Sequence, residues 1–397
     1  MVEFVTVATF LVAALASLFM AWSIGAGSSG STPFAPAVGA NAISVMRAGF
    51  LVGILGFAGA VLQGANVSET MGGDLIGGVT LSPMAATIAL IIAATLVATG
   101  VFLGYPIATA FTSTGAVIGA GLAMGGTPAW GTYTEIAAMW ILTPFVGSFF
   151  AYVIARALRE EPIPERYVII GLAGVVGLLI ANIEFAILGP PDGGASLAET
   201  ASALLPGSVL AGVVAGSLAM VILWMVPTAL AVRNDPARAQ RRFLLVMGGL
   251  VAFSAGGSQV GLAIGPLIPM SGDVGLPITA LLVGGGVGLL IGSWTGAPRM
   301  IKAISQDYSS LGPRRSIAAL IPSFAIAQAA VLFGIPVSFN EIVVSSIIGS
   351  GYAAAGAGGG GVSARKMGLT VLAWVLSLVG SIIIAYGGYV LIDLIRF

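Results

Sequence analysis

The sequence predicts an all-α polytopic membrane protein with about 12 transmembrane segments in two inverted repeats, containing broken helices or re-entrant hairpins. Three observations support this fold class. The chain is 58% hydrophobic and only 8% charged, whereas a soluble domain carries about 25% charged residues. Twelve stretches are long and apolar enough to cross a bilayer, which takes about 20 residues. Two polar, glycine-containing motifs occur in both halves of the chain at matched spacing.

The candidate spans follow one another along the chain with mostly short connections. Their approximate ranges are 4–24, 43–63, 82–103, 105–124, 134–155, 167–188, 207–230, 243–264, 276–294, 317–334, 335–352 and 368–392. The turns Gly104–Pro106 and Gly334–Pro336 leave almost no loop between neighbouring spans. We therefore expect segments 105–124 and 335–352 to be re-entrant hairpins or broken helices, with simple spans as the alternative.

Basic residues mark alternate connections between the spans. They are Arg156, Arg159, Arg166, Arg233, Arg238, Arg241, Arg242, Arg299, Lys302, Arg314, Arg315, Arg365 and Lys366. The intervening connections carry Asp and Glu but no Lys or Arg. By the positive-inside rule the basic connections are cytoplasmic. We therefore expect a multi-pass protein of the cell membrane with both termini extracytoplasmic.

The composition excludes several functional classes. The 15 basic residues balance the 15 acidic ones, so nucleic acid is not an expected partner. The chain has no Cys and no His, which removes disulfides, thiolate metal sites and the commonest general base. We expect no enzyme activity, no cofactor and no metal site, and the lipid bilayer as the surrounding partner.

The stretch Ser23–Gly39, SIGAGSSGSTPFAPAVG, closes the first span without a single charge. Gly and Pro weaken helix interiors, and Ser and Thr compete for backbone hydrogen bonds. At membrane depth, non-helical backbone persists only where protein or a water-filled cavity satisfies its polar groups. A helix broken in this way offers N–H groups and hydroxyls to an oxyanion. A related stretch, SAGGSQVGLAIGP, returns at Ser254–Pro266.

Each break is followed by a Gly-X-Pro segment at nearly the same distance. The separations are 104 − 25 = 79 in the first half and 334 − 256 = 78 in the second. The breaks lie in spans one and eight, an odd number apart, so the two copies run antiparallel. Such inverted repeats place the substrate of many secondary transporters near the midplane. We expect a first repeat at 1–130, connecting helices at 131–242, a second repeat at 243–355 and a C-terminal loop and helix at 356–397.

The paired motifs resemble those of the inorganic phosphate transporter (PiT) family, whose repeats carry a GANDVANAIGP-type break and a G-[IL]-P-V-S-T-T-H-type segment. The resemblance covers Met20–Gly121 and Val251–Gly351. The matching residues are Gly25, Ala26, Val38, Gly39, Gly104, Pro106, Thr109 and Gly115, and then Gly256, Ala263, Ile264, Gly265, Pro266, Leu267, Gly334, Pro336, Val337 and Ser338. The family resemblance implies transport of a tetrahedral oxyanion.

The sequence departs from this family at the residues that the resemblance associates with sodium and phosphate. Where the family has an Asn-Asp pair, the second repeat has Ser258 and Gln259 and the first has Gly27 and Ser28. The family's His corresponds to Phe111 in one repeat and Glu341 in the other. Small neutral residues with a Glu in place of His are more similar to the sulfate permease branch.

The expected anion ligands are hydroxyls, amides and backbone N–H groups of the two breaks and the two Pro-containing segments. They are Gly25, Ser28, Ser29, Ser31, Thr32, Thr109, Gly256, Gly257, Ser258, Gln259, Ser338 and Asn340. Sulfate only accepts hydrogen bonds, so a set of neutral donors slightly favours sulfate over phosphate. For each single hydroxyl, the alternative is a bond to its own helix backbone.

Glu341 is the strongest candidate for coupling transport to an ion gradient. It lies in an apolar stretch, and an intramembrane acid is a functional hypothesis by default because burying its charge costs several kcal/mol. The alternative is a hydrated position at a helix end.

We therefore predict a secondary active transporter, or permease, that carries sulfate or phosphate by alternating access with H⁺ or Na⁺ coupling. A sodium-coupled phosphate symporter is the alternative within the family, and an anion channel is the alternative from another class. The chain is also a candidate homodimer.

Overall fold

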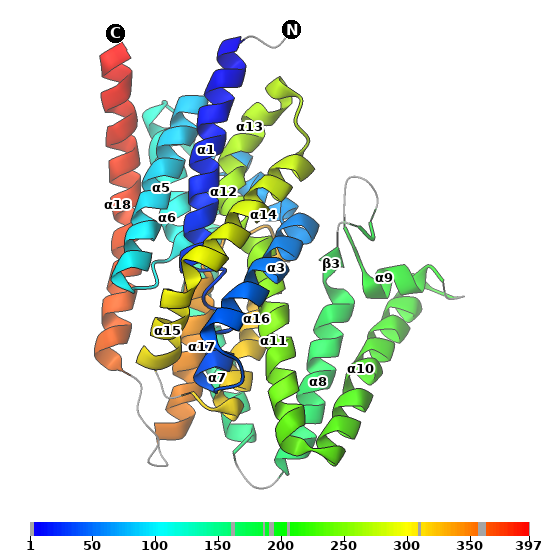
Figure 1. The fold of residues 1–397 in the computed structure, drawn as a ribbon. Helices are drawn as coiled ribbons and strands as arrows, with labels where there is room; N and C mark the ends of the chain where they lie inside the picture. The colour runs from blue at the N-terminus through cyan, green and yellow to red at the C-terminus, as the bar shows by residue number, and fades with distance from the viewer. Residues whose placement is uncertain are drawn as a thin grey trace.

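The computed structural model describes residues 4–159, 163–185, 187–189, 194–204, 207–308, 311–355 and 363–396. Over these residues the chain is a tall bundle of helices, and the start of α1 lies at the same end of the molecule as the end of α18 (Figure 1). Strands are confined to two short antiparallel ladders within the described residues. The ladder of β1 (Ile76–Gly77) and β2 (Thr127–Pro128) is one, and that of β3 (Glu184–Phe185) and β4 (Ala195–Ser196) is the other.

Ten apolar segments among the described residues are long enough to cross a membrane. They correspond to α1 (Phe4–Gly27), α3 (Val45–Gln63), α5 (Pro83–Leu103), α7 (Trp130–Ala157), α8 (Glu165–Asn182), α10 (Val209–Asn234), the run that begins with α11 (Pro236–Gln259), α14 (Ile278–Thr295), α16 (Pro313–Leu332) and α18 (Ala364–Arg396). The predicted all-α polytopic membrane protein is confirmed.

The other two predicted spans are shorter helices, α6 (Thr109–Ala123) and α17 (Phe339–Ala355). At about 1.5 Å per residue they measure about 22 and 26 Å, less than the hydrocarbon thickness of about 30 Å. Each packs against the helix before it. We call α5 with α6 hairpin 1, and α16 with α17 hairpin 2.

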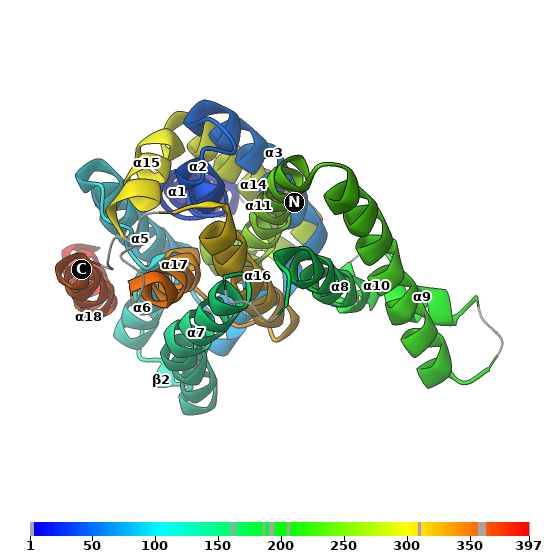
Figure 2. The same cartoon turned by 90° about the horizontal axis from the view of Figure 1, so that it is seen from below.

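The remaining elements are short and lie between the long helices. They are α2 (Ala35–Gly39), α4 (Ala65–Glu69), the π-helix η1 (Thr70–Asp74), α9 (Leu197–Ser202), α12 (Gly261–Ile264), η2 (Gly265–Leu267), α13 (Ile268–Ser271), η3 (Gly272–Val274) and α15 (Ala297–Asp307). The helices α8 and α10 pack on each other and stand to one side of the bundle (Figures 1 and 2).

The packing follows the predicted inverted repeat. Helix α1 packs against α14 and α5, and in the same way α11 packs against α3 and α16. Helix α6 of hairpin 1 lies along α18, whereas α17 of hairpin 2 lies along α7. Each hairpin is therefore held by the long helix that follows the other hairpin in the chain.

The two hairpin turns have the same local structure because they share the Gly-X-Pro pattern. Gly104 and Gly334 end α5 and α16 with φ angles of 74° and 65°, the left-handed region that favours glycine. The next residue's N–H then bonds five residues back, Tyr105 to Gly100 O at 3.0 Å and Ile335 to Ala330 O at 2.9 Å.

The two predicted breaks differ in structure. In the first, α1 ends at Gly27, the chain turns, and α2 begins at Ala35. In the second, α11 ends at Gln259 but Val260 keeps helical angles of −60° and −36° before α12 begins. The predicted break at Ser254–Pro266 is present, since α11 ends at Gln259 and α12 begins at Gly261, but it is milder than the first. This stretch has no proline before Pro266, and glycine lowers helix propensity far less than proline does.

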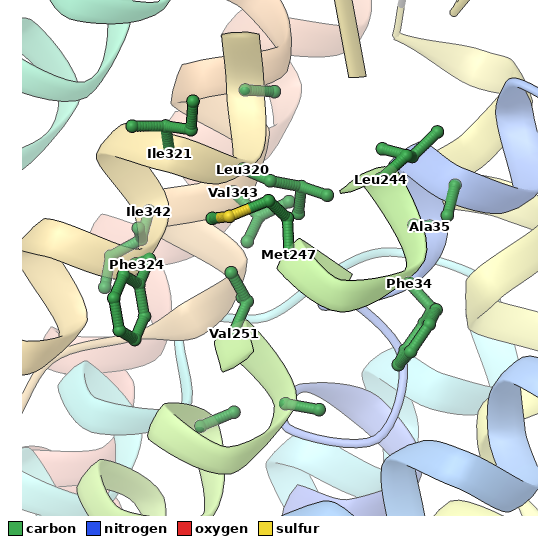
Figure 3. Close-up of a cluster of buried hydrophobic side chains, with 14 of the residues drawn as sticks. Phe34, Ala35, Leu244, Met247, Val251, Leu320, Ile321, Phe324, Ile342 and Val343 are labelled. Atoms are coloured by element: carbon green, nitrogen blue, oxygen red, sulfur yellow. The ribbon is translucent and has the colours of Figure 1, made fainter. Parts of the chain in front are cut away.

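A hydrophobic core fixes the first break against the second half of the molecule. Phe34, directly after the turn, is 1% exposed and packs in one buried cluster with Met247 of α11 and Phe324 of α16 (Figure 3). Burying a side chain of this size contributes about 1.5–3 kcal/mol. The turn between α1 and α2 is thus anchored at its C-terminal end.

Candidate functional site

The centre of the molecule holds a hydrogen-bonded cluster of Ser28, Thr109 and Gln259, which we call the central cluster. Thr109 Oγ1 donates to Gln259 Oε1 at 2.7 Å, and Ser28 Oγ donates to the same oxygen at 3.2 Å. The two hydroxyl oxygens lie 3.3 Å apart. All three side chains are 0% exposed. The cluster joins the first break, hairpin 1 and the end of α11, segments that are far apart in the sequence.

Both hairpin turns close over the central cluster. Gln259 Nε2 donates to the carbonyl of Val337 in the turn of hairpin 2. From hairpin 2, Asn340 Nδ2 donates to Gly27 O at 2.9 Å and to Ile107 O, in the turn of hairpin 1, at 2.6 Å. The two hairpins and the first break are therefore linked directly through one amide.

The second helix of each hairpin begins beside the central cluster. The first bonds of these helices run from Thr112 N to Ala108 O at 3.1 Å and from Ile342 N to Ser338 O at 3.0 Å. The N–H groups of the first turn have no partner within the helix, and a helix N-terminus favours negative charge. Two helix N-termini thus meet at one place, an arrangement suited to an oxyanion.

Four predicted site residues carry a buried polar atom without a protein partner. They are Ser258 Oγ, Ser338 Oγ, Asn340 Oδ1 and Glu341 Oε2, in side chains that are at most 2% exposed. Leaving such a group unpaired costs about 1–3 kcal/mol. Three of them lie where hairpin 2 turns into α17 and the fourth lies at the end of α11, and unpaired buried atoms of this kind are what a polar ligand would satisfy.

Three hydroxyls of the first break bond to their own backbone instead. Ser29 Oγ donates to Ile24 O at 3.5 Å, Ser31 Oγ to Ser28 O at 3.2 Å, and Thr32 Oγ1 to Ser28 O at 3.1 Å. This is the alternative that the sequence leaves open for each single hydroxyl. These hydroxyls stabilise the turn, and the structure does not bring them into the central cluster.

The predicted glycine ligands lie in helix contacts. A Cβ on Gly25 would lie 2.2 Å from Leu289 O of α14, and one on Gly256 would lie 1.8 Å from Gly56 O of α3. A Cβ on Gly257 would lie 2.8 Å from the Gln63 side chain. These glycines permit close approach of neighbouring helices.

Glu341 lines a cavity of about 440 Å³ between α7, α17 and α18. The cavity is otherwise mostly apolar, with Phe111, Trp140 and Trp374 among its lining residues. Phe111, the counterpart of Glu341 in hairpin 1, stacks on Trp140 with ring centroids 3.9 Å apart. The carboxyl group therefore lies on the side of α17 that faces this cavity.

Two tryptophans hold the hairpin turns, a role that the sequence did not reveal. Trp140 Nε1 donates to Pro336 O, and Trp374 Nε1 donates to Pro106 O, each at 2.8 Å. The indole N–H of Trp140 is therefore bonded inside the protein. The signal that could have found the pair is its spacing, since 140 − 106 = 34 and 374 − 336 = 38.

A second polar group missed from the sequence lies beside α11. Gln328 Nε2 donates to Ser254 Oγ at 2.6 Å and to Gln63 Oε1 at 3.2 Å. Gln63 Nε2 in turn donates to Glu184 O at 2.7 Å. These amides are each 6% exposed. They join α3, α16 and β3 to α11, the helix that ends with Gln259 of the central cluster.

Comparison with known proteins agrees with this architecture. A relative from Thermococcus kodakarensis, named as a phosphate permease, is 27% identical over 369 residues, covering 86% of this chain and 88% of that protein. A similarly named relative from Pyrococcus furiosus is 27% identical over 372 residues, covering 86% and 87%. The chloroplastic inorganic phosphate transporter 2-1 of Arabidopsis thaliana is 25% identical, covering 85% of this chain and 65% of that protein.

A solved structure named "The sodium-dependent phosphate transporter" has the same fold. It superposes with a TM-score of 0.81 at 22% identity, covering 98% of this chain and all of that chain. The predicted nearness to a sulfate permease branch finds no support, because the relatives are named for phosphate. Residues 24–385 match the phosphate transporter family, and the chain therefore belongs to that family.

Proposed function

We propose that the protein is a secondary transporter of inorganic phosphate that works by alternating access and is driven by a sodium gradient. The observation that carries this proposal is the central cluster of Ser28, Thr109 and Gln259, buried where two hairpin turns and two helix N-termini meet. The neutral donors and first-turn N–H groups suit a tetrahedral oxyanion. The neutral donor set alone slightly favours sulfate. Membership of the phosphate transporter family favours phosphate instead, and we give this the greater weight.

In this proposal the two hairpins are the gates, and their inverted arrangement lets each one open the central cluster toward a different side of the membrane. In the described conformation both turns cover the central cluster, because Asn340 bonds to the first break and to Ile107 O of the opposite turn. Moving hairpin 1 away from this amide would open the cluster toward one side of the membrane. Moving hairpin 2 would break the Gln259 contact with Val337 O and open the cluster toward the other side.

Sodium is proposed as the coupling ion because the solved structure with the same fold is that of a sodium-dependent phosphate transporter. No group of three or more acidic, His or Cys side chains gathers in the described part of the chain, so the sodium ligands would be mainly neutral oxygens. The competing proposal is proton coupling through Glu341, supported by its 2% exposure and its unpartnered Oε2 atom. The Glu341→Gln variant separates these two proposals.

The deciding experiment measures uptake of labelled phosphate and sulfate by purified protein in liposomes, under separate sodium and pH gradients. We expect saturable accumulation of phosphate that requires the sodium gradient and that survives Glu341→Gln. Uptake driven by the pH gradient alone, and abolished by Glu341→Gln, would replace sodium with protons. Accumulation of sulfate without phosphate would refute the proposed substrate. Downhill flux without accumulation under either gradient would identify an anion channel.

The orientation of the protein in the membrane and its assembly are also proposals. The shared end of the two termini is proposed to be extracytoplasmic, as the distribution of Lys and Arg indicates. The homodimer and the boundaries at 130, 242 and 355 stay predictions. Protease accessibility of a C-terminal tag in sealed cells would test the orientation, since the tag should be cleaved from outside.

A further inference from the structure

The orientation of the Asn340 amide is determined by its neighbours. Its Nδ2 atom lies 2.9 Å from Gly27 O and 2.6 Å from Ile107 O. Both neighbours are backbone carbonyls, which only accept hydrogen bonds. The nitrogen must therefore face them, and the amide oxygen must point the other way. Both N–H groups of the amide are used by these two bonds.

The remaining atom, Asn340 Oδ1, has no protein partner although the side chain is 1% exposed. An amide oxygen can accept a hydrogen bond but cannot donate one. The two carbonyls that hold the amide belong to Gly27 and Ile107, one and two residues before the hydroxyls of Ser28 and Thr109 in the central cluster. A ligand bound beside Asn340 that brings a donor would satisfy this oxygen, and a ligand without a donor would not.

Tetrahedral oxyanions differ in this respect at neutral pH. Phosphate and arsenate retain at least one protonated oxygen, whereas sulfate and selenate are fully deprotonated and can only accept. Resting on the proposed function, we propose that Asn340 Oδ1 accepts the hydrogen bond of the protonated phosphate oxygen. Asn340 is then the residue that selects protonated oxyanions and rejects sulfate.

The other unpartnered atoms do not make this distinction. The hydroxyls of Ser258 and Ser338 can rotate to donate or to accept, so they suit a sulfate oxygen as well as a protonated phosphate oxygen. Glu341 lines the cavity between α7, α17 and α18. Ala110, the counterpart of Asn340 in hairpin 1 (340 − 230 = 110), has no polar side chain. Selection by an acceptor therefore falls to one half of the molecule.

Two substitutions at this position separate selection from structure. Asn340→Asp and Asn340→Ala both remove the N–H donors to Gly27 O and Ile107 O, so the loss of these two hydrogen bonds is shared. Only Asn340→Ala removes the acceptor. The measurement is inhibition of labelled phosphate uptake in liposomes by unlabelled phosphate, arsenate, sulfate and selenate, with the folded fraction checked by size-exclusion chromatography.

For the unsubstituted protein, we expect arsenate to compete within a few-fold of phosphate, and sulfate and selenate to compete at least about tenfold more weakly, as expected for an acceptor left unpaired. Asn340→Asp should keep this rejection of sulfate even though the added charge weakens uptake. Asn340→Ala should bring sulfate within about threefold of phosphate. Asn66→Ala, which removes a bond from Nδ2 to Val331 O outside the central cluster, should leave the ratio unchanged.

Two outcomes would overturn the inference while the proposed function stands. One is Asn340→Ala that still rejects sulfate as strongly as the unsubstituted protein. The other is a loss of sulfate rejection in both Asn340→Asp and Asn340→Ala. That result would assign the effect to the lost N–H bonds and not to the acceptor. An unsubstituted protein that takes up no phosphate would refute the proposed function itself, a result distinct from either of these.

Discussion

The two halves of the molecule share a backbone plan but bring different chemistry to equivalent positions. The hairpin turns have matching hydrogen bonds, and their glycines stand 334 − 104 = 230 residues apart. At the helix ends, Ser28 faces its counterpart Gln259 (259 − 28 = 231) and bonds to it. In the hairpins, Asn340 and Glu341 of the second half replace the apolar Ala110 and Phe111 of the first.

This difference indicates a division of labour. The first half supplies a turn and small hydroxyls, whereas the second half supplies the long amides and the acid. Under the proposed alternating access, symmetry of the backbone would serve the alternation between two open states, for which both hairpins need similar stability. Recognition of a single anion has no such requirement, so the side chains are free to diverge.

The glycines at the ends of α1 and α11 should give the largest effects of all, on folding. The added Cβ of Gly256→Ala or Gly25→Ala would lie 1.8 Å from Gly56 O or 2.2 Å from Leu289 O. We expect each to lower the free energy of unfolding by about 3 kcal/mol, because overpacking against backbone is relieved only by moving a helix. Gly284→Ala, which meets nothing within 4 Å, should be neutral or stabilising.

Thermal unfolding in detergent measures these changes. An equal, small effect at all three positions would show that the helix contacts at Gly25 and Gly256 are not close. The comparison between halves is sharpened if Gly256→Ala is more damaging than Gly25→Ala, since its closest contact is the shorter.

Gln259 should give the largest effect on transport. Gln259→Leu removes the acceptor of two buried hydroxyls and the donor to Val337 O. Unpaired buried groups cost about 1–3 kcal/mol each, and we expect kcat/KM for phosphate uptake to fall about 100-fold. Ser28→Ala should cost only about tenfold, because the 2.7 Å bond from Thr109 to Gln259 survives.

Uptake kinetics in liposomes provide this comparison, with the folded fraction of each variant as its control. If Ser28→Ala were the more damaging change, the first half would be the one that recognises the anion. The division of labour would then be reversed.

Much of the fold was predictable because hydropathy and turn chemistry act locally. Apolar runs of membrane-spanning length located the helices, and the Gly-X-Pro pattern located both hairpin turns. The break at Ser254–Pro266 is milder than the first, since glycines lower helix propensity without excluding a helix that packs tightly on its neighbours.

The sequence predicted the stretches that contain the central cluster, but not which of their residues form it. Ser28, Ser29, Ser31 and Thr32 share one short stretch, and the turn's geometry decides which hydroxyl meets Gln259, 231 residues away. Composition does not encode that choice. The glycines predicted as N–H donors were similarly ambiguous, because a residue without a side chain serves helix packing and anion binding equally well.

The tryptophan bonds to the hairpin turns should give a smaller, side-specific effect. Trp140→Phe removes the donor to Pro336 O and Trp374→Phe removes the donor to Pro106 O, while each keeps an aromatic ring. One such bond contributes about 1 kcal/mol, which corresponds to about a fivefold change in the population of an opened hairpin. Each variant should loosen only the hairpin that its own indole holds.

The opening of each hairpin can be measured with single introduced cysteines, because the sequence contains no Cys. Single cysteines at the equivalent positions Ile335→Cys and Tyr105→Cys report on hairpins 2 and 1 through their rates of reaction with a water-soluble thiol reagent. Trp140→Phe should speed labelling at position 335 alone, and Trp374→Phe at position 105 alone. Acceleration of both sites by either variant would mean that the hairpins open together, contrary to alternating access.

The smallest effects should come from the hydroxyls of the first break that bond to their own backbone. Ser29→Ala and Thr32→Ala remove bonds to Ile24 O and Ser28 O within the same turn, and we expect phosphate uptake to change by less than about twofold. A loss of tenfold or more would mean that these hydroxyls turn toward the anion when a hairpin opens. The first half would then contact the anion in a second conformation. The difference between the halves would hold only for the conformation in which both hairpin turns cover the central cluster.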